Sequence, residues 1–493
     1  MRIRRLGTAT LLTLALALVP VPARAAPAAG PPAAAPAAGT PALTRTDLAT
    51  RDTNGYPQYR IPALAVTGRG TLLAAYDGRP SMADLPSPIT DLVRRSTDGG
   101  RTWTAQQVVR TGPAPQGFGD PSLLVDRRTG RVFLFYAASV NQGFAGSHTG
   151  NDPDDPNVLQ ADYSYSDDDG VTWHARRITA QIKDPAWKGM FAASGQGIQL
   201  TTGPYAGRLI QQYAVGASGG NYAVSAYSDD DGDTWHMGTP VGPGMDENKT
   251  VQLADGSVML NVRAAPHRLV ALSHDGGVTY SAPQPDPAQI DPGDNGAIIR
   301  YAPDAPASDP RAHWLLLSNT ADPSVRRNLT VRMSCDDGKS WPVSRVVEPQ
   351  SSAYSTLATL PGGRVGLFYE RAGYQQMTYA SFGLDWLGGV CAPLAVGTQP
   401  LAAGTAGSVQ VTVTNQAATP LAAGTLTLDV PAGWTAGTVR VPPLPRGAHT
   451  QVDVPVTPAR TAGGQVDLTA QYTVEARHSS SRATLSVTPA QDA

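Results

Sequence analysis

One eight-residue pattern occurs five times in this chain of 493 residues and limits the folds that are open to it. The pattern is Ser-x-Asp-x-Gly-x-Thr/Ser-Trp/Tyr, and its copies occupy residues 96–103, 166–173, 228–235, 273–280 and 334–341. The Ser and Asp side chains can bond nearby backbone groups and so hold a tight turn. The Gly permits a positive φ, and the final aromatic residue can pack onto a sheet. Each copy predicts a hairpin turn, and the repetition predicts a repeated architecture.

Short strand-forming runs precede the copies, which start 45 to 70 residues apart. Residues 92–95 precede the first copy, for example, and residues 329–333 precede the last. A four-stranded propeller blade with its loops takes about 50 to 60 residues. Further runs bounded by Gly, Pro, Asp and Asn predict strands at residues 71–76, 132–137, 208–213, 258–262 and 313–317. No long amphipathic helix stands out, so we expect an all-β propeller.

The repeated turn is the Asp box, and over residues 44–389 the chain resembles the bacterial exo-sialidases, or neuraminidases. That family carries Phe/Tyr-Arg-Ile-Pro near its start, and this chain has Tyr59-Arg60-Ile61-Pro62 before its first box. The resemblance implies a six-bladed β-propeller with the boxes on its outer rim, far from the active site. Because Asp boxes also occur in propellers without sialidase activity, the activity has to be inferred from other residues.

Composition divides the chain into four parts. Residues 1–25 have a basic start, an apolar core and a small-residue end, which is the pattern of a secretory signal peptide. Residues 26–43 are almost only Ala, Pro, Gly and Thr, which predicts a disordered linker. The propeller is expected over residues 44–390. Residues 391–493 lack boxes and show alternating strands at 409–414, 426–430, 451–456 and 466–474, which predicts an immunoglobulin-like β-sandwich with a structural or spacer role.

Charge and cysteine content exclude several kinds of partner. The net charge of −2 and the pI near 6.4 provide no basic patch for nucleic acid or an anionic membrane. No apolar run is long enough to span a membrane. The signal-peptide pattern predicts a secreted protein, which we expect to be a monomer. Secretion permits disulfides, and the only two cysteines, Cys335 and Cys391, are expected to pair with each other.

Three arginines are candidates for binding a carboxylate, because a guanidinium fork can hold one by two parallel hydrogen bonds. The resemblance implies that Arg60 binds the sugar carboxylate, and that Arg263 and Arg326 are its second and third partners. Arg327 is an alternative to Arg326, although neighbouring residues of a strand point to opposite faces. Glu370 resembles the acidic residue that orients the first arginine, while a structural ion pair is its simpler interpretation.

Three further residues complete the predicted catalytic set by resemblance. Tyr354 corresponds to the nucleophile, Glu247 to its base, and Asp84 to the acid/base on a loop after the first blade strand. Asp77 and Asp91 lie nearby in the sequence and are alternatives to Asp84, because loop aspartates often cap turns.

Other contacts to the sugar are predicted at its periphery. Asp120 and Phe191 are candidates for the N-acetyl arm, and Gln196 for the glycerol tail. The histidines show no metal-binding spacing, and Asp229-Asp230-Asp231-Gly232 lacks the alternating ligands of a calcium loop. We therefore expect neither a metal nor another cofactor.

These features predict a secreted exo-sialidase that releases terminal sialic acid from glycoconjugates with retention of configuration. Two alternatives remain at this point. One is a non-catalytic propeller that binds sialylated or other glycans, and the other is a trans-sialidase that transfers the sugar to another sugar instead of water.

Overall fold

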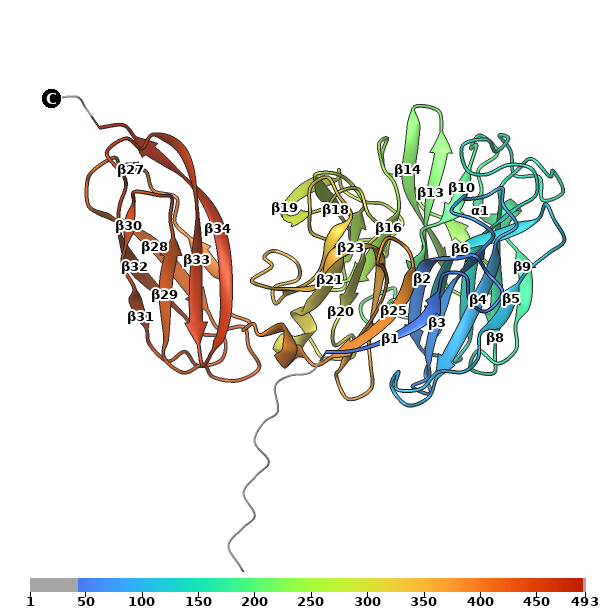
Figure 1. The fold of residues 1–493 in the computed structure, drawn as a ribbon, viewed down its shortest axis with the longest axis horizontal. Coiled ribbons are helices and arrows are strands. Elements are labelled where there is room, and N and C mark those ends of the chain that lie inside the picture. Colours follow the sequence, from blue (N-terminus) through green and yellow to red (C-terminus); the bar gives the residue numbers. More distant parts are fainter. Residues whose placement is uncertain (1–42, 491–493) are drawn as a thin grey trace, which may run out of the picture. The chain divides into compact units, whose positions relative to one another are not determined.

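The computed structural model describes residues 43–490, whose regular secondary structure is almost entirely β-strand (Figure 1). The described part contains one short α-helix, α1 (Thr179–Ile182), and two 3₁₀ turns, η1 (Pro310–His313) and η2 (Leu384–Leu387). Its helices are too short to cross a membrane. The predicted signal peptide, residues 1–25, and the linker up to residue 42 lie outside the described residues.

Six four-stranded blades make up the propeller, as expected; the last two share the long strand β23 and therefore form one seven-stranded sheet. Blade 1 contains β2 (Gln58–Val66), β3 (Leu72–Arg79), β4 (Thr90–Ser96) and β5 (Gln107–Arg110). Blade 2 contains β6 (Gly117–Val125), β7 (Val132–Ser139), β8 (Gln160–Ser166) and β9 (His174–Arg177). In blade 3 the inner strand is divided into two pieces, β10 (Met190–Ala192) and β12 (Ile198–Gln199), which both pair with β13 (Leu209–Ala217). The strands β14 (Gly220–Ser228) and β15 (His236–Met237) complete this blade.

In the remaining blades, as in the first three, the strands are named from the inner to the outer one. Blade 4 contains β16 (Asn248–Gln252), β17 (Val258–Val262), β18 (His267–Ser273) and β19 (Gln284–Ile290). Blade 5 contains β20 (Ala297–Arg300), β21 (Leu315–Thr320), β22 (Arg327–Ser334) and the first part of β23 (Val343–Thr359). Blade 6 contains the rest of β23, β24 (Val365–Arg371), β25 (Gln376–Phe382) and β1 (Thr44–Thr50). The short strand β11 (Gly195–Gln196) pairs in parallel with β6. The strand predicted at 313–317 begins only at Leu315, because His313 is the last residue of the 3₁₀ turn η1.

The Asp boxes connect the third and fourth strands of blades 1 to 5. In blade 6 the third strand is β25 and the fourth is β1, from the other end of the propeller sequence, so no turn joins them. This arrangement explains why a six-bladed ring carries five boxes. It also closes the ring, because β1 and β25 pair antiparallel from Thr44 opposite Ser381 to Thr50 opposite Gln376.

The box at Ser228 shows how the motif holds its turn. The Ser228 hydroxyl donates to Asp230 Oδ1 at 2.7 Å and accepts from the Gly232 N–H at 2.9 Å. Asp230 in turn accepts from both the backbone and the hydroxyl of Thr234. Gly232 has φ +86°, and a Cβ there would lie 2.3 Å from a Phe133 ring carbon, so only Gly fits. Trp235 is 2% exposed and packs edge-on against the rings of blade 2, as the motif predicted.

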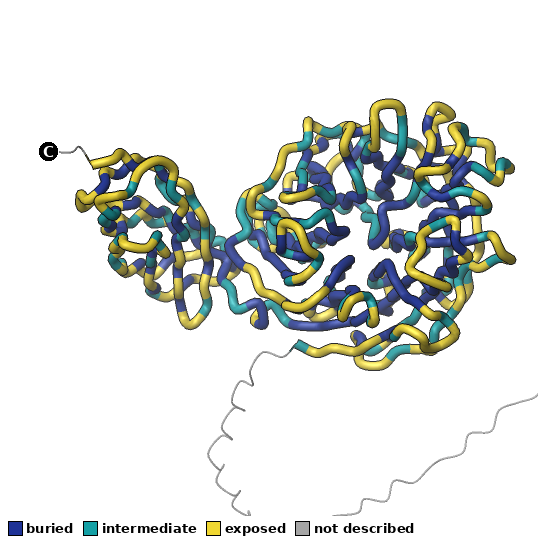
Figure 2. Tube along the Cα trace, turned by 45° about the horizontal axis from the view of Figure 1, so that its top comes forward, coloured by how far each residue is buried: buried dark blue, intermediate teal, exposed yellow. Residues whose placement is uncertain are grey.

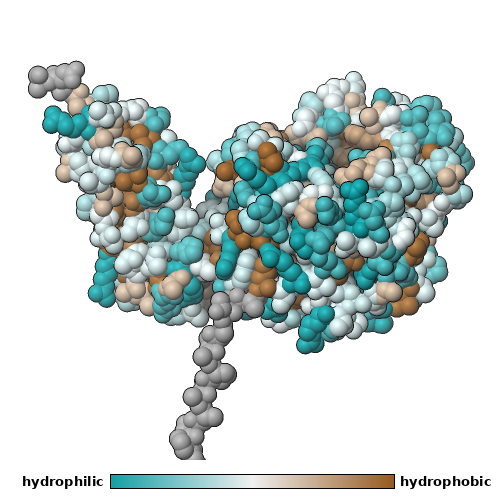
Figure 3. All heavy atoms as spheres, in the orientation of Figure 1, coloured by the Kyte–Doolittle hydropathy of each residue, from teal (hydrophilic) through white to brown (hydrophobic). Residues whose placement is uncertain are grey.

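The hydrophobic core of the propeller lies between neighbouring blades. One cluster combines residues of blades 1 and 2, including Leu73 and Leu134, and another combines blades 2 and 3, including Phe135 and Tyr213. Figure 2 shows that buried segments gather toward the middle of the propeller while its outer loops are exposed. On the face drawn in Figure 3, polar and apolar residues are intermixed.

The C-terminal residues form a second all-β unit of two sheets. One sheet contains β26 (Leu394–Val396), β28 (Gly407–Thr414), β32 (His449–Thr457) and β30 (Thr435–Ala436). The other contains β27 (Leu401–Ala402), β34 (Arg477–Thr488), β33 (Gly464–Val474), β29 (Gly424–Asp429) and β31 (Val439–Val441). Alternate residues of β28, at 409, 411 and 413, are buried, as expected for a sandwich. The expected disulfide between Cys335 and Cys391 is present, with 5.7 Å between the Cα atoms.

Candidate active site

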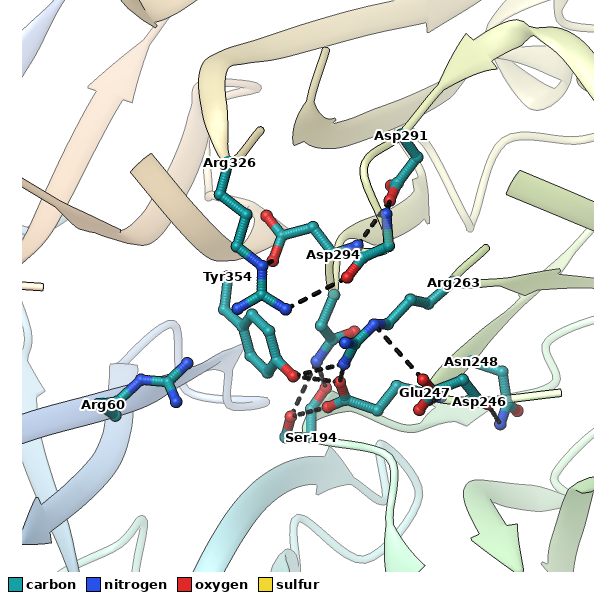
Figure 4. A network of polar contacts seen from close by, with 12 residues as sticks. Arg60, Ser194, Asp246, Glu247, Asn248, Arg263, Asp291, Asp294, Arg326 and Tyr354 are labelled. Carbon is teal, nitrogen blue, oxygen red and sulfur yellow. Dashed lines mark hydrogen bonds and ion pairs between the residues drawn. The ribbon is translucent and has the colours of Figure 1, made fainter. Parts of the chain in front are cut away.

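The candidate catalytic residues come from different blades and meet at the start of the inner strands. Arg60 lies near the beginning of β2, Glu247 directly precedes β16, and Tyr354 lies in the second part of β23. Figure 4 shows the Tyr354 ring surrounded by Arg60, Arg263 and Arg326, with Glu247 at its hydroxyl end. Residues that are far apart in the sequence therefore form one polar cluster.

Tyr354 and Glu247 form the centre of this cluster. The Tyr354 hydroxyl donates to Glu247 Oε2 and accepts from Arg263 Nη1 at 2.8 Å. Burial, reinforced by the negative charge of Glu247, raises the pKa of Tyr354 well above its ordinary value. The resting phenol is therefore neutral, and it can act as a nucleophile only if it loses its proton.

Glu247 is the group placed to take that proton. Its carboxylate accepts from Arg263 Nη1 at 2.6 Å and from the Ser194 hydroxyl at 2.9 Å, in addition to Tyr354. Burial acts to raise the pKa of Glu247, but Arg263, Lys249 and the hydrogen bonds outweigh it, and the net direction is downward. A buried acceptor that stays ionised beside a neutral phenol is the arrangement that general base catalysis needs.

The three candidate arginines converge on the Tyr354 ring. Their guanidinium carbons lie 5.3 Å (Arg60), 5.8 Å (Arg263) and 5.2 Å (Arg326) from its centroid. Three guanidinium groups that converge in this way offer several donors to one anionic ligand, such as a carboxylate. Arg327 points elsewhere: it pairs with Asp322 at 2.7 Å, and its side chain is 56% exposed. Of the two neighbouring arginines, the geometry therefore favours Arg326.

Glu370 holds Arg60 through a two-pronged ion pair. Arg60 Nε and Nη2 donate to the two Glu370 oxygens at 3.1 and 3.3 Å, and Glu370 is fully buried. The same carboxylate accepts from the backbone N–H of Ile61 at 2.9 Å. Ile61 has φ +62°, a rare conformation for a β-branched residue, at a bulge in β2. Glu370 thus fixes both the arginine and the strained backbone beside it.

Asp84 lies on the loop between β3 and β4 with its side chain 76% exposed. Its Oδ1 accepts from Arg79 Nη1 at 2.6 Å, while the buried Arg79 is also paired with Asp77. Asp77 and Asp91, the two alternatives to Asp84, are fully buried. Burial raises the pKa of Asp77 to about 6 and that of Asp91 well above its ordinary range. Among these three carboxyl groups, Asp84 is the one that a bound glycan could reach.

The peripheral candidates separate into two groups. Asp120 lies at a bulge of β6 with φ +63°, and its pKa is raised by burial and by the charges of Asp77 and Glu247, which places it beside the cluster. Phe191, on β10, packs edge-on against Phe144. Gln196, on β11, instead lines a cavity of about 800 Å³ together with Val66 and other residues from the far ends of the inner strands. The structure thus does not bring Gln196 together with the Tyr354 cluster.

Several residues of the cluster were not found by sequence reasoning. Tyr374 lies under Arg60, with 4.7 Å from the guanidinium carbon to the ring centroid, and its hydroxyl accepts from Arg326 at 3.2 Å. Asp294 is fully buried and 3.3 Å from Arg326 Nε. Asp246, beside Glu247, lies 3.5 Å from Arg263 Nε. No motif distinguishes these residues, although Asp246 directly precedes the predicted base, Glu247. Within residues 43–490, no group of three His, Cys, Asp or Glu side chains is arranged to hold a metal ion.

Comparisons with known proteins agree with this fold. Residues 70–367 match the family model described as a BNR repeat-like domain, and residues 401–477 match the NPCBM-associated, NEW3 domain of alpha-galactosidase. The first match defines the class, an Asp-box propeller.

The particular family follows from individual relatives. A sialidase of Micromonospora viridifaciens is 50% identical over 453 residues, which cover 90% of this chain and 70% of the relative. A sialidase of Bacteroides fragilis is 31% identical over 63% of this chain and 60% of its own length. Among solved structures, the Hadza microbial sialidase Hz136 aligns with a TM-score of 0.61 at 29% identity, over 67% of this chain and 66% of that one. The chain belongs to the sialidase family, and it is a glycoside hydrolase that hydrolyses sialic acid linkages.

Proposed function

We propose that the chain is a secreted, retaining exo-α-sialidase that releases terminal sialic acid from glycoproteins, glycolipids and oligosaccharides through a tyrosyl intermediate. The observation that carries this proposal is the buried hydrogen bond from Tyr354 to Glu247 within a ring of three arginines. Arg60, Arg263 and Arg326 would bind the carboxylate of sialic acid. Residues 44–390 would form the catalytic unit, and residues 391–493 a structural sandwich.

A charge argument supports Tyr354 as the nucleophile. Most retaining glycosidases attack with a carboxylate, and sialidases are a known exception. The anomeric carbon of sialic acid carries its own carboxylate, so a carboxylate nucleophile would approach like charge in a poorly screened site. Tyr354 approaches as a neutral phenol and gives its proton to Glu247 as it attacks. Arg263, which donates to the Tyr354 oxygen at 2.8 Å, would also stabilise that oxygen as it leaves the sugar.

Asp84 is the candidate acid/base. Its exposed position on the β3–β4 loop gives it access to the leaving glycan, and Arg79 holds one of its oxygens in place. Asp84 would protonate the leaving oxygen in the first step and activate water in the second. Asp120 and Phe191 would contact the N-acetyl arm, and no metal or other cofactor is needed for any of these steps.

A labelling experiment tests the proposal. A 2,3-difluoro-sialosyl fluoride should attach covalently to Tyr354, and digestion with mass spectrometry should locate the adduct. Proton NMR of a sialoside digest should show the α-anomer as the first product, as retention requires. An adduct on another residue, or a β-anomer as the first product, would contradict the mechanism. Repeating the digest with lactose present measures transfer, and a dominant transfer product would favour the trans-sialidase alternative.

Secretion is supported by the Cys335–Cys391 disulfide, since such bonds persist in oxidising compartments. Expression of the full chain in a secreting bacterial host, followed by N-terminal sequencing of the protein in the medium, tests it. The mature protein should start at Ala26, and retention of the uncleaved chain inside the cell would argue against secretion.

A further inference from the structure

A buried lysine lies behind the Tyr354–Glu247 pair and takes no part in the mechanism proposed above. Lys249 is 1% exposed and lies on β16, two residues after Glu247. Residues two apart on an extended strand point to the same face, so Lys249 extends in the direction of Glu247. Gly195 leaves room for it, because a Cβ at residue 195 would lie 3.0 Å from Lys249 Cε.

The amine of Lys249 begins a chain of hydrogen bonds that ends on Glu247. Lys249 Nζ donates to Asn295 Oδ1 at 2.9 Å, and Asn295 Nδ2 donates to the Ser194 hydroxyl at 2.8 Å and to the Ser194 carbonyl at 3.0 Å. The Ser194 hydroxyl then donates to Glu247 Oε1 at 2.9 Å. All four side chains are at most 3% exposed. Figure 4 shows Ser194 at the carboxylate of Glu247, on the side away from Arg326.

The direction of this chain follows from the chemistry of the amine. A protonated lysine has hydrogen-bond donors but no acceptor. Asn295 must therefore turn its oxygen toward Lys249 and its NH₂ toward Ser194. The Ser194 hydroxyl, which accepts from Asn295, must therefore give its own hydrogen to Glu247. The chain thus ends with the Ser194 hydroxyl as a donor to Glu247 Oε1, while Oε2 accepts from Tyr354 and Arg263.

Burying the Lys249 amine costs free energy of desolvation, and filling the space in the core does not need a charged group. Its two acceptors, Asn295 Oδ1 and the Asn248 carbonyl, are neutral. Burial lowers the pKa of Lys249 to about 7, while the charge of Glu247 acts in the opposite direction. An apolar side chain of similar length would fill the space without this penalty. The lysine is therefore better explained by what its charge and its hydrogen bonds do for Glu247.

We propose that Lys249, Asn295 and Ser194 form a positioning chain that orients the Glu247 carboxylate toward Tyr354 and keeps it ionised as the base. The inference rests on the function proposed above and adds three positioning residues to that reaction. Three charged or titratable groups from other strands face Glu247: Arg263 from the end of β17, Tyr354 from β23 and Asp120 from β6. Two more, Asp246 and Lys249, are neighbours of Glu247 in the sequence. The positive charge of Arg268, on β18, acts on Lys249.

Lys249→Met tests the chain because it keeps the length of the side chain and removes the charge and the donors. We expect kcat to fall by about tenfold or more, with little change in KM. We also expect the acidic limb of the kcat/KM profile to move up by about 1 pH unit, as expected when a nearby opposite charge is lost. Lys183→Met is the matched control. Lys183 is also a buried lysine, but it donates to the Gly150 carbonyl beside helix α1, and its loss should leave the profile unchanged.

Thermal unfolding and circular dichroism will show whether Lys249→Met folds. If it does not, Ser194→Ala tests the positioning chain in its place. It removes one oxygen and the only side-chain donor to Glu247 Oε1 among the hydrogen bonds described, so the acidic limb should again move up. Superimposable pH profiles for the folded variants and the wild type would overturn the inference, and so would an equal shift in Lys183→Met. Labelling of wild-type Tyr354 by the difluoro probe separates the two hypotheses. If the wild type is not labelled there, the proposed function fails; if it is labelled and the profiles coincide, only the positioning chain fails.

Discussion

Tyr354 and Glu247 are joined by a hydrogen bond across 107 positions of sequence, and the phenol is the donor. The two groups have pKa values displaced in opposite directions, upward for Tyr354 and downward for Glu247. The proton therefore stays on the phenol at rest, and in the mechanism proposed above it would move to Glu247 only as the developing bond to carbon makes the phenol more acidic. In that mechanism the pairing would supply the phenolate only during the attack, so that the resting site need not hold a second negative charge beside Glu247.

Replacing Tyr354 with Phe removes the attacking oxygen and leaves the ring in contact with the three arginines. We expect kcat to fall by at least about 10²-fold, with unchanged binding of sialic acid as measured by calorimetry. The variant should also form no covalent adduct with the difluoro probe. Tyr165→Phe is a suitable control, because Tyr165 lies on the outer part of blade 2. A Tyr354→Phe protein that keeps normal turnover would show that another residue attacks.

Arg60→Lys keeps the charge but loses the fork that grips Glu370. A lysine can present only a point charge to a carboxylate, so we expect KM to rise about tenfold or more. Initial rates on a fluorogenic sialoside over a range of concentrations measure this. Arg327→Lys, which changes an arginine paired with Asp322 outside the cluster, should leave KM unchanged. An increase in KM for Arg327→Lys, with none for Arg60→Lys, would reverse the assignment of these arginines.

Asp84→Asn should slow the reaction according to the leaving group. An acid is needed to expel a poorly acidic sugar hydroxyl, but much less to expel an acidic phenol. The loss of kcat/KM should therefore be larger for sialyllactose than for a nitrophenyl sialoside. Asp154→Asn, an exposed change on another loop, should affect neither. Equal losses on both substrates would mean that Asp84 acts in binding and not as the acid.

Asp294 should make stability depend on pH. Burial raises the pKa of Asp294 to about 7, against the lowering influence of Arg326, from an ordinary value of 3.8. The folded state thus binds this proton more tightly than the unfolded state, so the contribution is fully present below about pH 4 and is lost as the pH rises toward 7. Asp294→Asn should flatten the fall of the melting temperature between pH 4 and 7. An unchanged slope in the variant would show that Asp294 is ionised throughout this range.

The Cys335–Cys391 disulfide should contribute to stability without affecting catalysis. It links positions 56 residues apart, and closing such a loop stabilises a fold by about 4 kcal/mol in the chain-entropy model. The double variant Cys335→Ala/Cys391→Ala should unfold at a lower urea concentration while it keeps the kcat of the wild type. Equal midpoints for the two proteins would show that the unfolded chain gains little freedom when the bond is absent.

The fold was largely predictable from sequence because its signals are local. Each Asp box holds its own turn through contacts within eight residues, so the boxes were recognisable without knowledge of the rest of the chain. The pairing of β1 with β25 left no such signal, because it depends on residues at opposite ends of the propeller. The predicted signal peptide lies outside the described residues, and the predicted roles of the site residues remain predictions.

Predictability in the site followed the same rule. Arg60 stands in a recognisable motif and lies in the cluster. Asp294 and Lys249 have no motif, because their role depends on which side chains surround them after folding. Gln196 was assigned to the glycerol tail by its neighbours in sequence, but β11 pairs with β6 at Ser122 and Leu123 and so lies further along the inner strands. The position of a residue along the inner strands depends on how the strands pair, and neighbouring residues in the sequence do not reveal that pairing.

The pairing of β1 with β25 also has a consequence for the order in which the protein can be made. Thr44 emerges from the ribosome among the first residues of the described part, but its partner Ser381 emerges more than three hundred residues later. Blade 6 therefore waits for nearly the whole propeller to be synthesised, and the ring stays open until then. If the chain is secreted as proposed above, export before blade 6 forms would avoid pulling a closed ring apart.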